Sequence, residues 1–402
     1  MNRIYLDHNA TTPVDPAVLE AMLPYLREAY GNASSVHEPG RVAREAVDRA
    51  REQVAHLIGA EPREIVFTSG GTEADNQAVR GVLELARTPD NRPGHVITSA
   101  IEHPAVLNTC QYVAKQGVAV TYLPVDATGR VKLDELAPAL TPETVLVSVM
   151  LANNEVGTIQ PVGEIARLAH AKGVTVHTDA VQGLGRIPVN VGDLGVDLLT
   201  ISGHKIYGPK GIGALYVRRG TRIAPLLYGG HHEKRRRAGT ENVPAIVGFG
   251  RACEIAGERL AEVAAREARL RDRLQEGILA RVPHTQVNGH LTERLPNTVN
   301  VGFAFVEGES LLMNLDLEGI AVSTGSACSS GDLKPSHVLL AMGLDHATAH
   351  GTLRFSLGRA NTEFEIDATI DAVARVVERV RAMSPMYSDF KKRQRAGAAS
   401  PA

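Results

Sequence analysis

Between residues 60 and 220 the sequence alternates short β-rich segments with stretches of helical periodicity, and this alternation restricts the fold more than any other feature. The β-rich segments are nearly all apolar and rich in Val and Ile, as strands covered by helices on both faces should be. Such alternation predicts an α/β fold with a mostly parallel sheet and right-handed crossovers. The predicted strands are 64–68, 95–100, 118–125, 145–151, 174–178 and 197–201.

A second, smaller α/β unit follows a long helical region that is predicted from Pro244 to Arg281. That region is rich in Ala, Glu and Arg, and it is long enough to run from one domain into another. Beyond it, strands are predicted at 298–306 and 352–357, and a capping box at Thr362–Glu365 begins a final amphipathic helix. We therefore predict a large domain, a small domain built from both ends of the chain and a disordered tail, with the boundaries 16–260, 1–15 plus 261–385, and 386–402.

The composition and charge exclude several classes of protein. Lys and Arg number 43 and Asp and Glu number 45, so the formal net charge of −2 argues against a nucleic-acid-binding platform. No apolar run approaches the roughly 18 residues that a membrane-spanning helix needs, and the N-terminus lacks the apolar core of a signal peptide. Cys110, Cys253 and Cys328 are far apart in the sequence, which excludes a disulfide framework and a metal site built from thiolates alone. We expect a cytoplasmic enzyme without nucleic-acid or membrane partners.

Polar and small residues follow the predicted strands, at the edge where open parallel sheets bind ligands. After Thr68 the chain reads Ser-Gly-Gly-Thr-Glu, a turn that can present amides to a phosphate, although Gly-Gly turns alone are common. Two later strands end close to Asp179 and to Lys205. Each alone has a plainer interpretation, Lys205 as a surface lysine and Asp179 as a helix N-cap. Together, a Schiff-base lysine, a carboxylate for a ring nitrogen and a phosphate-binding turn favour a site for pyridoxal phosphate.

The same strand-end segments resemble a known family. Residues 178–182 and 202–205 are similar to the fold-type I pyridoxal-phosphate enzymes, and among them to the cysteine desulfurases. The segment 323–330, Ser-Thr-Gly-Ser-Ala-Cys-Ser-Ser, resembles the loop that carries the catalytic cysteine in the NifS and IscS class, and the chain lacks the Gly-His-His-Cys segment of the SufS class. The resemblance covers nearly the whole chain, and the motifs most similar to NifS are 102–107, 229–234 and 238–242.

The resemblance implies a fold-type I pyridoxal-phosphate transferase and a role for each site residue. Lys205 would form the Schiff base with the cofactor and later move a proton, for which a released amine is well placed. Asp179 would pair with the pyridinium nitrogen, Gln182 with the phenolic oxygen, and His103 would stack on the ring and act in proton transfer. The remaining cofactor-binding residues are implied to be Gly71, Thr72, Asn154, Ser202, His204 and Thr240.

Arg354 lies in a β-patterned run, where an arginine is often part of a salt bridge at the rim of a sheet. An amino-acid substrate needs a planar fork for its α-carboxylate, which Arg supplies and Lys does not. The resemblance places this fork at Arg354 and gives Asn154 contacts with both substrate and cofactor. Thr240, after the basic run 234–237, matches a residue that reaches the phosphate of the neighbouring subunit, which implies a homodimer with shared sites.

Cys328 is surrounded by Ser, Gly and Ala, in a segment expected to bury little and to be mobile, as a sulfur carrier requires. A nucleophilic cysteine must be a thiolate, so we expect a lowered pKa for Cys328 near a cationic cofactor. Cys110 and Cys253 lie in helical patterns and are predicted to be small buried hydrophobic residues. No dedicated metal site is predicted, but the resemblance allows Cys328 to be a transient ligand of an iron–sulfur cluster shared with a scaffold protein.

The activity that the resemblance implies is that of a cysteine desulfurase, which converts L-cysteine to L-alanine and leaves a persulfide on Cys328. By the similarity to NifS, an iron–sulfur scaffold protein would accept this sulfur for nitrogenase cluster assembly. The C-terminal tail does not resemble the tail with which IscS docks its scaffold, so the acceptor stays open. Two other classes also stay open: a selenocysteine lyase or an aminotransferase on the same cofactor, and a non-catalytic scaffold. The joint presence of Lys205, Asp179 and Cys328 argues against the last.

Overall fold

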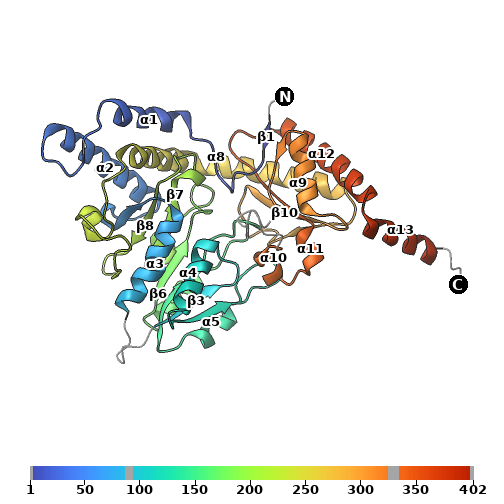
Figure 1. Ribbon diagram of the computed structural model, residues 1–402, viewed down its shortest axis with the longest axis horizontal. Helices are drawn as coiled ribbons and strands as arrows, with labels where there is room; N and C mark the ends of the chain where they lie inside the picture. The colour runs from blue at the N-terminus through green and yellow to red at the C-terminus, as the bar shows by residue number, and fades with distance from the viewer. Residues whose placement is uncertain (1–2, 87–93, 325–334, 399–402) are drawn as a thin grey trace.

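The computed structural model of the chain describes residues 3–86, 94–324 and 335–398. Its larger part is built on a seven-stranded sheet with the strand order β2-β8-β7-β6-β5-β3-β4 (Figure 1). The strands from β7 to β4 pair in parallel, which confirms the mostly parallel sheet that the alternation predicts. The strands are β2 Ile65–Thr68, β3 His95–Ser99, β4 Ala119–Leu123, β5 Thr144–Ser148, β6 Thr175–Asp179, β7 Leu198–Ser202 and β8 Gly213–Val217.

The sequence did not predict β8, which lies between β2 and β7 and is antiparallel to both. It follows β7 after a short connection that holds one turn of 3-10 helix, η2 (Gly203–Lys205). Because an antiparallel neighbour needs no crossover helix, the alternation of strands and helices that identified the other six strands is interrupted here.

Helices cover both faces of the large sheet. On one face, α3 (Gly71–Leu85) and α4 (Pro104–Ala114) bury strand residues such as Val96 and Leu198. Their sequence neighbours Ile97 and Leu199 point to the opposite face, because successive strand residues alternate between faces. That face is covered by helices that include α2 Glu38–Leu57, α6 Val162–His170 and the first part of α8 Val243–Arg281. Shorter helices of this part are α5 Leu133–Ala139 and α7 Val191–Leu194, and 3-10 turns lie at η1 Pro62–Glu64 and η3 His232–Arg235.

The 39 residues of α8 join the two halves of the molecule, as the sequence predicts for this region. Ile246 and Phe249 lie in the core of the large part, beside α1 (Pro16–Arg27) and α2. Leu270 and Leu274 lie instead in a second core, where α8 contacts α12 (Glu363–Ala382). No helix of the described ranges is long and apolar enough to cross a bilayer.

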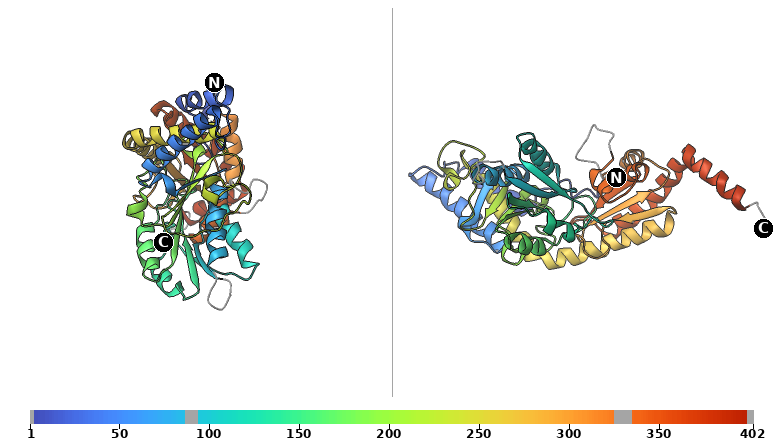
Figure 2. Two further views of the ribbon diagram at one scale, coloured as in Figure 1. Left: turned by 90° about the vertical axis from the view of Figure 1, so that its left-hand side faces the viewer. Right: turned by 90° about the horizontal axis from the view of Figure 1, so that it is seen from below.

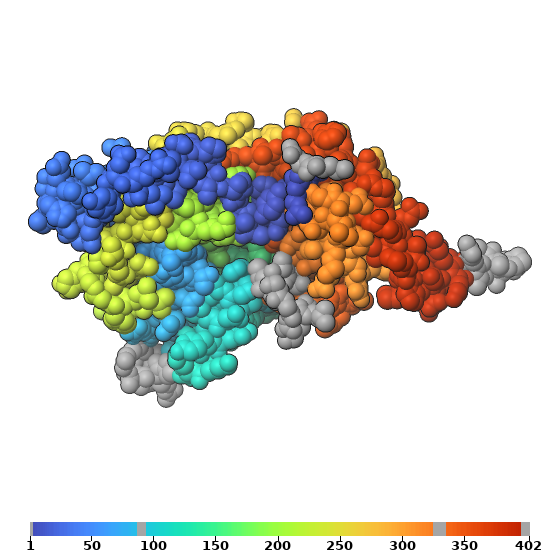
Figure 3. Space-filling model, turned by 45° about the horizontal axis from the view of Figure 1, so that its top comes forward, coloured from blue at the N-terminus to red at the C-terminus, as the bar shows by residue number. Residues whose placement is uncertain are grey.

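The second core belongs to the smaller part of the molecule, which lies at one end of the space-filling view (Figure 3). A three-stranded antiparallel sheet in the order β12-β10-β9 and the parallel pair β1-β11 supply its strands. Leu6, from the N-terminal segment, is completely buried in this core beside Phe355. The elements are β1 Ile4–Tyr5, β9 Thr285–Asn288, β10 Thr298–Phe303, α9 Gly308–Leu317, β11 Ile320–Ala321, β12 Thr352–Ser356 and α12.

Two short helices within the stretch that the sequence assigns to the small domain pack elsewhere. These are α10 (His337–Ala341) and α11 (His346–His350), whose Val338, Leu339 and Ala349 are buried in the core of the large part. The sequence shows that these helices have apolar side chains but not which of the two cores those side chains enter. A boundary drawn from the sequence therefore assigns both helices to the small domain.

The C-terminal tail differs from its predicted disorder, because Pro385–Ala398 forms helix α13. In Figure 2 this helix projects from the small-domain end of the molecule. Its first turns are held by an aromatic cluster in which Phe390 lies 4.7 Å from Phe305 and 5.0 Å from His284 between ring centroids. The many charged and small residues of the tail predict disorder, whereas this contact depends on only two aromatic side chains of the tail.

Candidate active site

The strand ends of the large sheet bring together the residues that the sequence predicts for a cofactor. Asp179 is the last residue of β6, and Ser202 is the last residue of β7. These strands pair in parallel with Asp179 opposite Thr200, so both strands end at one edge of the sheet. Lys205 is the last residue of η2, three residues after the end of β7. Asp179 and Lys205 therefore lie at the same edge of the sheet, as predicted, and the positive charge of Lys205 acts to lower the pKa of Asp179.

The Gly70-Gly71 turn lies against the same edge. Gly70 has a φ of +154°, which residues with a side chain rarely adopt, and α3 begins at the next residue. A methyl group on Gly71 would lie 3.0 Å from Val181 Cγ2 and 3.7 Å from Ser202 Cβ, so the helix N-terminus closely faces β6 and β7. Thr72 is exposed at this end of α3. The first amides of α3, with Thr72 and Ser202, therefore form a cradle suited to a phosphate group.

Asn9, which the sequence analysis missed, connects several of the predicted residues. Its carbonyl accepts hydrogen bonds from Lys205 Nζ at 2.5 Å and from Gln182 Nε2 at 3.0 Å. Its Nδ2 donates to the carbonyl of Asn154 at 3.1 Å and to Thr298 Oγ1 at 2.9 Å. The run of small polar residues around Asn9, without helical or strand periodicity, was the signal that could have marked it.

Asp179 is buried and holds its carboxylate against the backbone, with Oδ1 accepting from Val181 N at 2.9 Å. Burial raises the pKa of Asp179 to about 6, while that hydrogen bond and the charge of Lys205 act in the opposite direction. A protonated pyridinium nitrogen beside this carboxylate would supply a positive charge that stabilises the ionised form of Asp179, which burial disfavours. One helical turn on, Gln182 Oε1 is buried without a hydrogen-bond partner. Both side chains fit the polar atoms of pyridoxal phosphate.

Two histidines at the site are held neutral. His103 caps the N-terminus of α4, where its Nδ1 accepts from Ala105 N at 3.2 Å. His204 contacts Thr11 Oγ1 through Nδ1 at 3.1 Å. Burial, followed by the charge of Lys205, lowers the pKa of each imidazole to about 4. A neutral imidazole can stack on a ring and exchange a proton, as the resemblance implies for His103.

Arg354 is buried where the small domain meets the large one, not exposed at a sheet rim. Its Nη1 donates to the carbonyl of Asn154 at 2.9 Å, and its Nη2 donates to Asp7 Oδ1 at 2.8 Å. The Nε is buried without a hydrogen-bond partner. The guanidinium is thus ion-paired with Asp7, and its Nε–H is a donor left for a further carboxylate; a planar fork would combine this donor with a second guanidinium N–H.

Of the remaining predicted site residues, Thr240 does not enter this cluster. Thr240 is exposed after η3, and no hydrogen bond of its side chain is present in the described part of the chain. Cys328 lies outside the described residues. Cys110 and Cys253 are buried as predicted, and burial raises the pKa of the Cys110 thiol to about 12 and that of Cys253 further. Neither thiol is suited to be a thiolate nucleophile.

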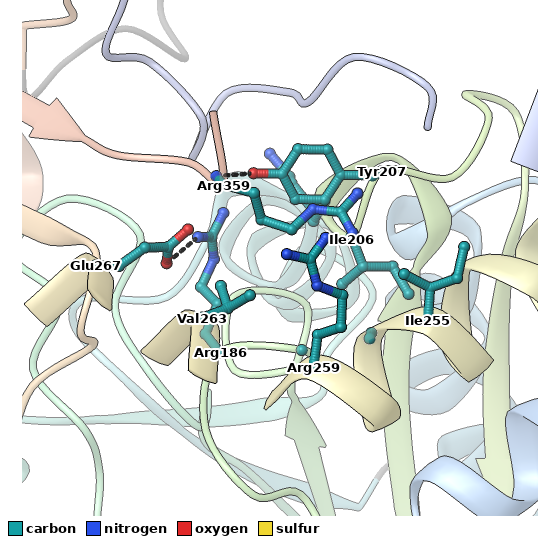
Figure 4. Close-up of a pocket in the computed structure, with 11 residues that line it drawn as sticks. Arg186, Ile206, Tyr207, Ile255, Arg259, Val263, Glu267 and Arg359 are labelled. Carbon is teal, nitrogen blue, oxygen red and sulfur yellow. Dashed lines mark hydrogen bonds and ion pairs between the residues drawn. The ribbon is translucent and has the colours of Figure 1, made fainter. Parts of the chain in front are cut away.

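A pocket is lined by Lys205, by Tyr207 on the loop that follows and by residues of α8 such as Glu267, and Asp179 and Ser202 are not part of its lining (Figure 4). An ion pair between Arg186 and Glu267, with 3.6 Å between Nη1 and Oε2, forms part of its wall. Tyr207 Oη accepts a hydrogen bond from Arg359 N at 2.7 Å. The first contact ties the segment after β6 to α8, and the second ties the loop after Lys205 to Arg359 of the small domain. Among the described residues, no cluster of His, Cys, Asp and Glu suited to a metal ion is present.

The parallel sheet, the strand-end lysine and carboxylate and the helix N-terminus define a fold-type I pyridoxal-phosphate enzyme. The chain matches the aminotransferase class-V family over residues 4–369 and belongs to it. A curated cysteine desulfurase of Nostoc sp. is 55% identical over 389 residues, which cover 97% of this chain and 96% of that relative.

Solved structures agree with this assignment. A structure described as a NifS-like protein superposes with a TM-score of 0.88 at 43% identity, over 94% of this chain and 99% of the other. A structure described as SspA in complex with cysteine superposes with a TM-score of 0.78 at 37% identity, over 88% of this chain and 98% of the other. The family resemblance of the strand-end motifs is thereby confirmed.

Proposed function

We propose that this chain is a pyridoxal-phosphate-dependent cysteine desulfurase, which converts L-cysteine to L-alanine and carries the released sulfur as a persulfide on Cys328. The observation that carries the proposal is one chain of hydrogen bonds: Lys205 binds the Asn9 carbonyl, and Asn9 Nδ2 binds the Asn154 carbonyl, which also accepts from Arg354. A lysine for the cofactor and an arginine for an amino-acid carboxylate are thus connected through Asn9 and Asn154. The names of the relatives, cysteine desulfurases, and the cysteine complex support the choice of substrate.

Pyridoxal phosphate would supply a carbonyl carbon that reacts with amines and a ring that withdraws electrons from the substrate Cα. The α3 N-terminus, Thr72 and Ser202 would hold its phosphate, with His204 beside them. Asp179 would keep the ring nitrogen protonated, and Gln182 would bind the phenolic oxygen. His103, neutral at physiological pH, would stack on the ring and exchange a proton.

Lys205 would hold the cofactor covalently through Nζ and, once displaced by the substrate amine, would move the Cα proton. Its present hydrogen bonds to the carbonyls of Asn9 and Ala10 hold the amine at the site. Arg354 would bind the substrate α-carboxylate and so orient the Cβ–S bond.

The sulfur step belongs to Cys328. Its thiolate would attack the sulfur of bound cysteine, so that an S–S bond forms and the substrate C–S bond breaks. The electron pair of that bond stays on the carbon fragment, which takes up a proton and leaves as alanine. An acceptor thiol or an iron–sulfur scaffold protein would then take the persulfide sulfur. Supply of nitrogenase clusters, a transient cluster ligand role for Cys328 and a cytoplasmic location stay predictions from the resemblance.

Incubation of the purified protein with L-cysteine and a reductant tests the function. We expect alanine and sulfide in equal amounts. Alanine that forms only when pyruvate is added, with mercaptopyruvate in place of sulfide, would indicate an aminotransferase. Turnover of selenocysteine alone would indicate a selenocysteine lyase. If neither product forms although the cofactor binds, the non-catalytic alternative regains support.

Arg354→Lys is expected to raise the apparent KM for cysteine by about 10- to 100-fold, because a hydrogen bond to a charged group contributes about 1.5–3 kcal/mol. A lysine ammonium cannot form the planar fork on the carboxylate. Steady-state kinetics of alanine formation measure the effect. Arg375→Lys is the control, since Arg375 is an exposed arginine of α12 that pairs with Glu318. An unchanged KM in Arg354→Lys would remove this residue from substrate binding.

The exposed Thr240 supports the proposal of a homodimer in which each subunit contributes Thr240 to the phosphate site of its partner. Hybrid dimers of Lys205→Ala and Thr240→Ala subunits test this arrangement. If the sites are shared, one site of each hybrid carries both changes and the other carries none. We therefore expect about half of the sites to regain the wild-type cofactor affinity and turnover. Hybrids without any native site, or a monomeric mass at working concentration, would contradict shared sites.

A further inference from the structure

Both ends of the segment that carries Cys328 are fastened next to Arg354. At the upstream end, Ser323 pairs with Arg354 in an isolated antiparallel bridge: Arg354 N donates to Ser323 O at 2.7 Å, and Ser323 N donates to Arg354 O at 3.2 Å. At the downstream end, the hydroxyl of Ser336 donates to Glu155 Oε2 at 2.5 Å. Glu155 directly follows Asn154, whose carbonyl is bound by the Arg354 guanidinium. Residues 325–334, between these two attachments, lie outside the described ranges.

The Glu155 end of this attachment is buried and hydrogen-bonded. Glu155 has a relative exposure of 4%, and its backbone N–H donates to Asn153 Oδ1 at 2.8 Å. Burial raises the pKa of Glu155 to about 7, while the Ser336 hydroxyl and the charge of Arg354 oppose this shift. Burying a carboxyl group without hydrogen-bond partners destabilises the folded state. The hydrogen bond from Ser336 therefore offsets part of the free-energy cost of burying Glu155.

The Ser336 end is equally well held. Ser336 is 3% exposed, and its Oγ also accepts from Leu339 N at 3.2 Å, which caps α10. Its neighbour His337 reaches the carbonyl of Glu102 with Nε2 at 2.9 Å. Val338 and Leu339 are completely buried in the core of the large part. The chain therefore emerges toward Cys328 from a point that is fixed to the strand ends of the large sheet.

We propose that Glu155 and Ser336 are positioning residues for the sulfur transfer, because their hydrogen bond sets where the Cys328 segment departs relative to Arg354. This inference rests on the proposed function, in which Arg354 holds the substrate carboxylate. The substrate sulfur lies only two carbon atoms from the carboxylate carbon, so Arg354 also sets the position of that sulfur. The described ends of the nucleophile's segment, Ser323 and Ser336, are held near the same arginine, so the contacts that orient the substrate also fix the two points between which the segment runs. Such orientation is a large source of rate.

The test separates substrate capture from sulfur transfer in single-turnover experiments on the cofactor-loaded protein. We expect Ser336→Ala to slow persulfide formation on Cys328, measured by mass spectrometry of quenched samples, by about tenfold, the scale of one hydrogen bond to a charged group. The change in cofactor absorption on addition of cysteine should keep its wild-type rate and concentration dependence. Ser336→Thr, which retains the hydroxyl, should recover most of the persulfide rate.

Asp345→Ala is the matched control, because Asp345 caps the neighbouring helix α11 through Thr348 N and has no contact with Glu155. It should leave the persulfide rate unchanged, which separates the Glu155 bond from the loss of a helix cap. Glu155→Gln keeps an acceptor oxygen and should cost less than Glu155→Ala, and Ser336→Ala should add nothing to Glu155→Ala.

Equal slowing of substrate capture and persulfide formation, an equal loss in Asp345→Ala, or a wild-type persulfide rate in Ser336→Ala would overturn the inference. Absence of a Cys328 persulfide in the wild-type protein would instead overturn the proposed function, on which the inference depends.

Discussion

Replacement of Lys205 by arginine is expected to abolish cysteine turnover while leaving the site assembled. Arginine can still donate hydrogen bonds to the carbonyls that Lys205 binds, those of Asn9 and Ala10, but a guanidinium forms no covalent bond with a carbonyl carbon at neutral pH. The variant also loses the amine that moves the Cα proton. We expect alanine formation to fall by at least about 10²- to 10⁴-fold, the contribution of a positioned proton-transfer group.

Absorption spectroscopy and alanine assays measure the two consequences of this change. Lys205→Arg and Lys205→Ala should bind cofactor without the covalent absorption band, because Asp179 and the α3 N-terminus are unchanged. Lys210→Ala is the control, since Lys210 is an exposed lysine on the same loop. If Lys205→Arg still produces alanine at the wild-type rate, Lys205 has no part in the chemistry, and a different amine must hold the cofactor.

The strand-end residues of this site were predictable because their positions follow from local patterns. An apolar run that ends at Asp179 and another that ends shortly before Lys205 place both side chains at one edge, once the sheet is taken as parallel. The direction of each strand needs no knowledge of distant contacts. The missed strand β8 does not change the predicted location of the site. Because β8 is antiparallel to both β2 and β7, those two strands still end at the same edge of the sheet.

The contacts that complete the site could not be predicted, because they join residues far apart in the sequence. Asn9 reaches Lys205 across 196 residues, and Arg354 reaches Asn154 across 200. The Ser336 hydroxyl reaches Glu155 across 181 residues. A serine and a glutamate of this kind are indistinguishable from surface residues in a single sequence, and only the packing of α10 against the large domain brings them together.

The prediction for the C-terminal tail was wrong, because the tail forms helix α13 where disorder was expected. Its composition, rich in Lys, Arg and Ala, predicts disorder because such residues bury too little apolar surface. Tyr387 and Phe390 nevertheless pack beside Phe305 and His284, and this contact holds one end of α13. Two aromatic side chains at a spacing of three residues lie on one helix face, a signal that average composition conceals.

Cys328→Ala is expected to separate the two halves of the proposed reaction. Substrate capture requires Lys205, Arg354 and the cofactor but no protein thiol, so cysteine should still change the cofactor absorption. Cleavage of the C–S bond requires a thiolate that accepts the sulfur. We therefore expect alanine and sulfide formation to fall by at least about 10³-fold, as happens when a covalent nucleophile is removed, with a much smaller change in apparent affinity.

The other two cysteines provide matched controls within the same chain. Cys110 and Cys253 are completely buried, and burial raises the pKa of each thiol, so neither can supply a thiolate near neutral pH. Cys110→Ala and Cys253→Ala should keep wild-type turnover and lose stability at most, by about 1 kcal/mol, as for the loss of a small buried group. Thermal unfolding and alanine assays measure these effects.

Mass spectrometry locates the transferred sulfur directly. After brief exposure of the wild-type protein to cysteine, one extra sulfur atom should be found on the peptide that contains Cys328. Because the attack forms an S–S bond on the thiolate that performs it, the extra sulfur marks the nucleophile itself. Extra sulfur on Cys110 or Cys253, or full activity in Cys328→Ala, would rule out the persulfide on Cys328. Full activity in Cys328→Ala without extra sulfur on another cysteine would mean that alanine arises without a protein thiol. An aminotransferase forms alanine only from pyruvate, so dependence of alanine formation on added pyruvate would identify that reaction.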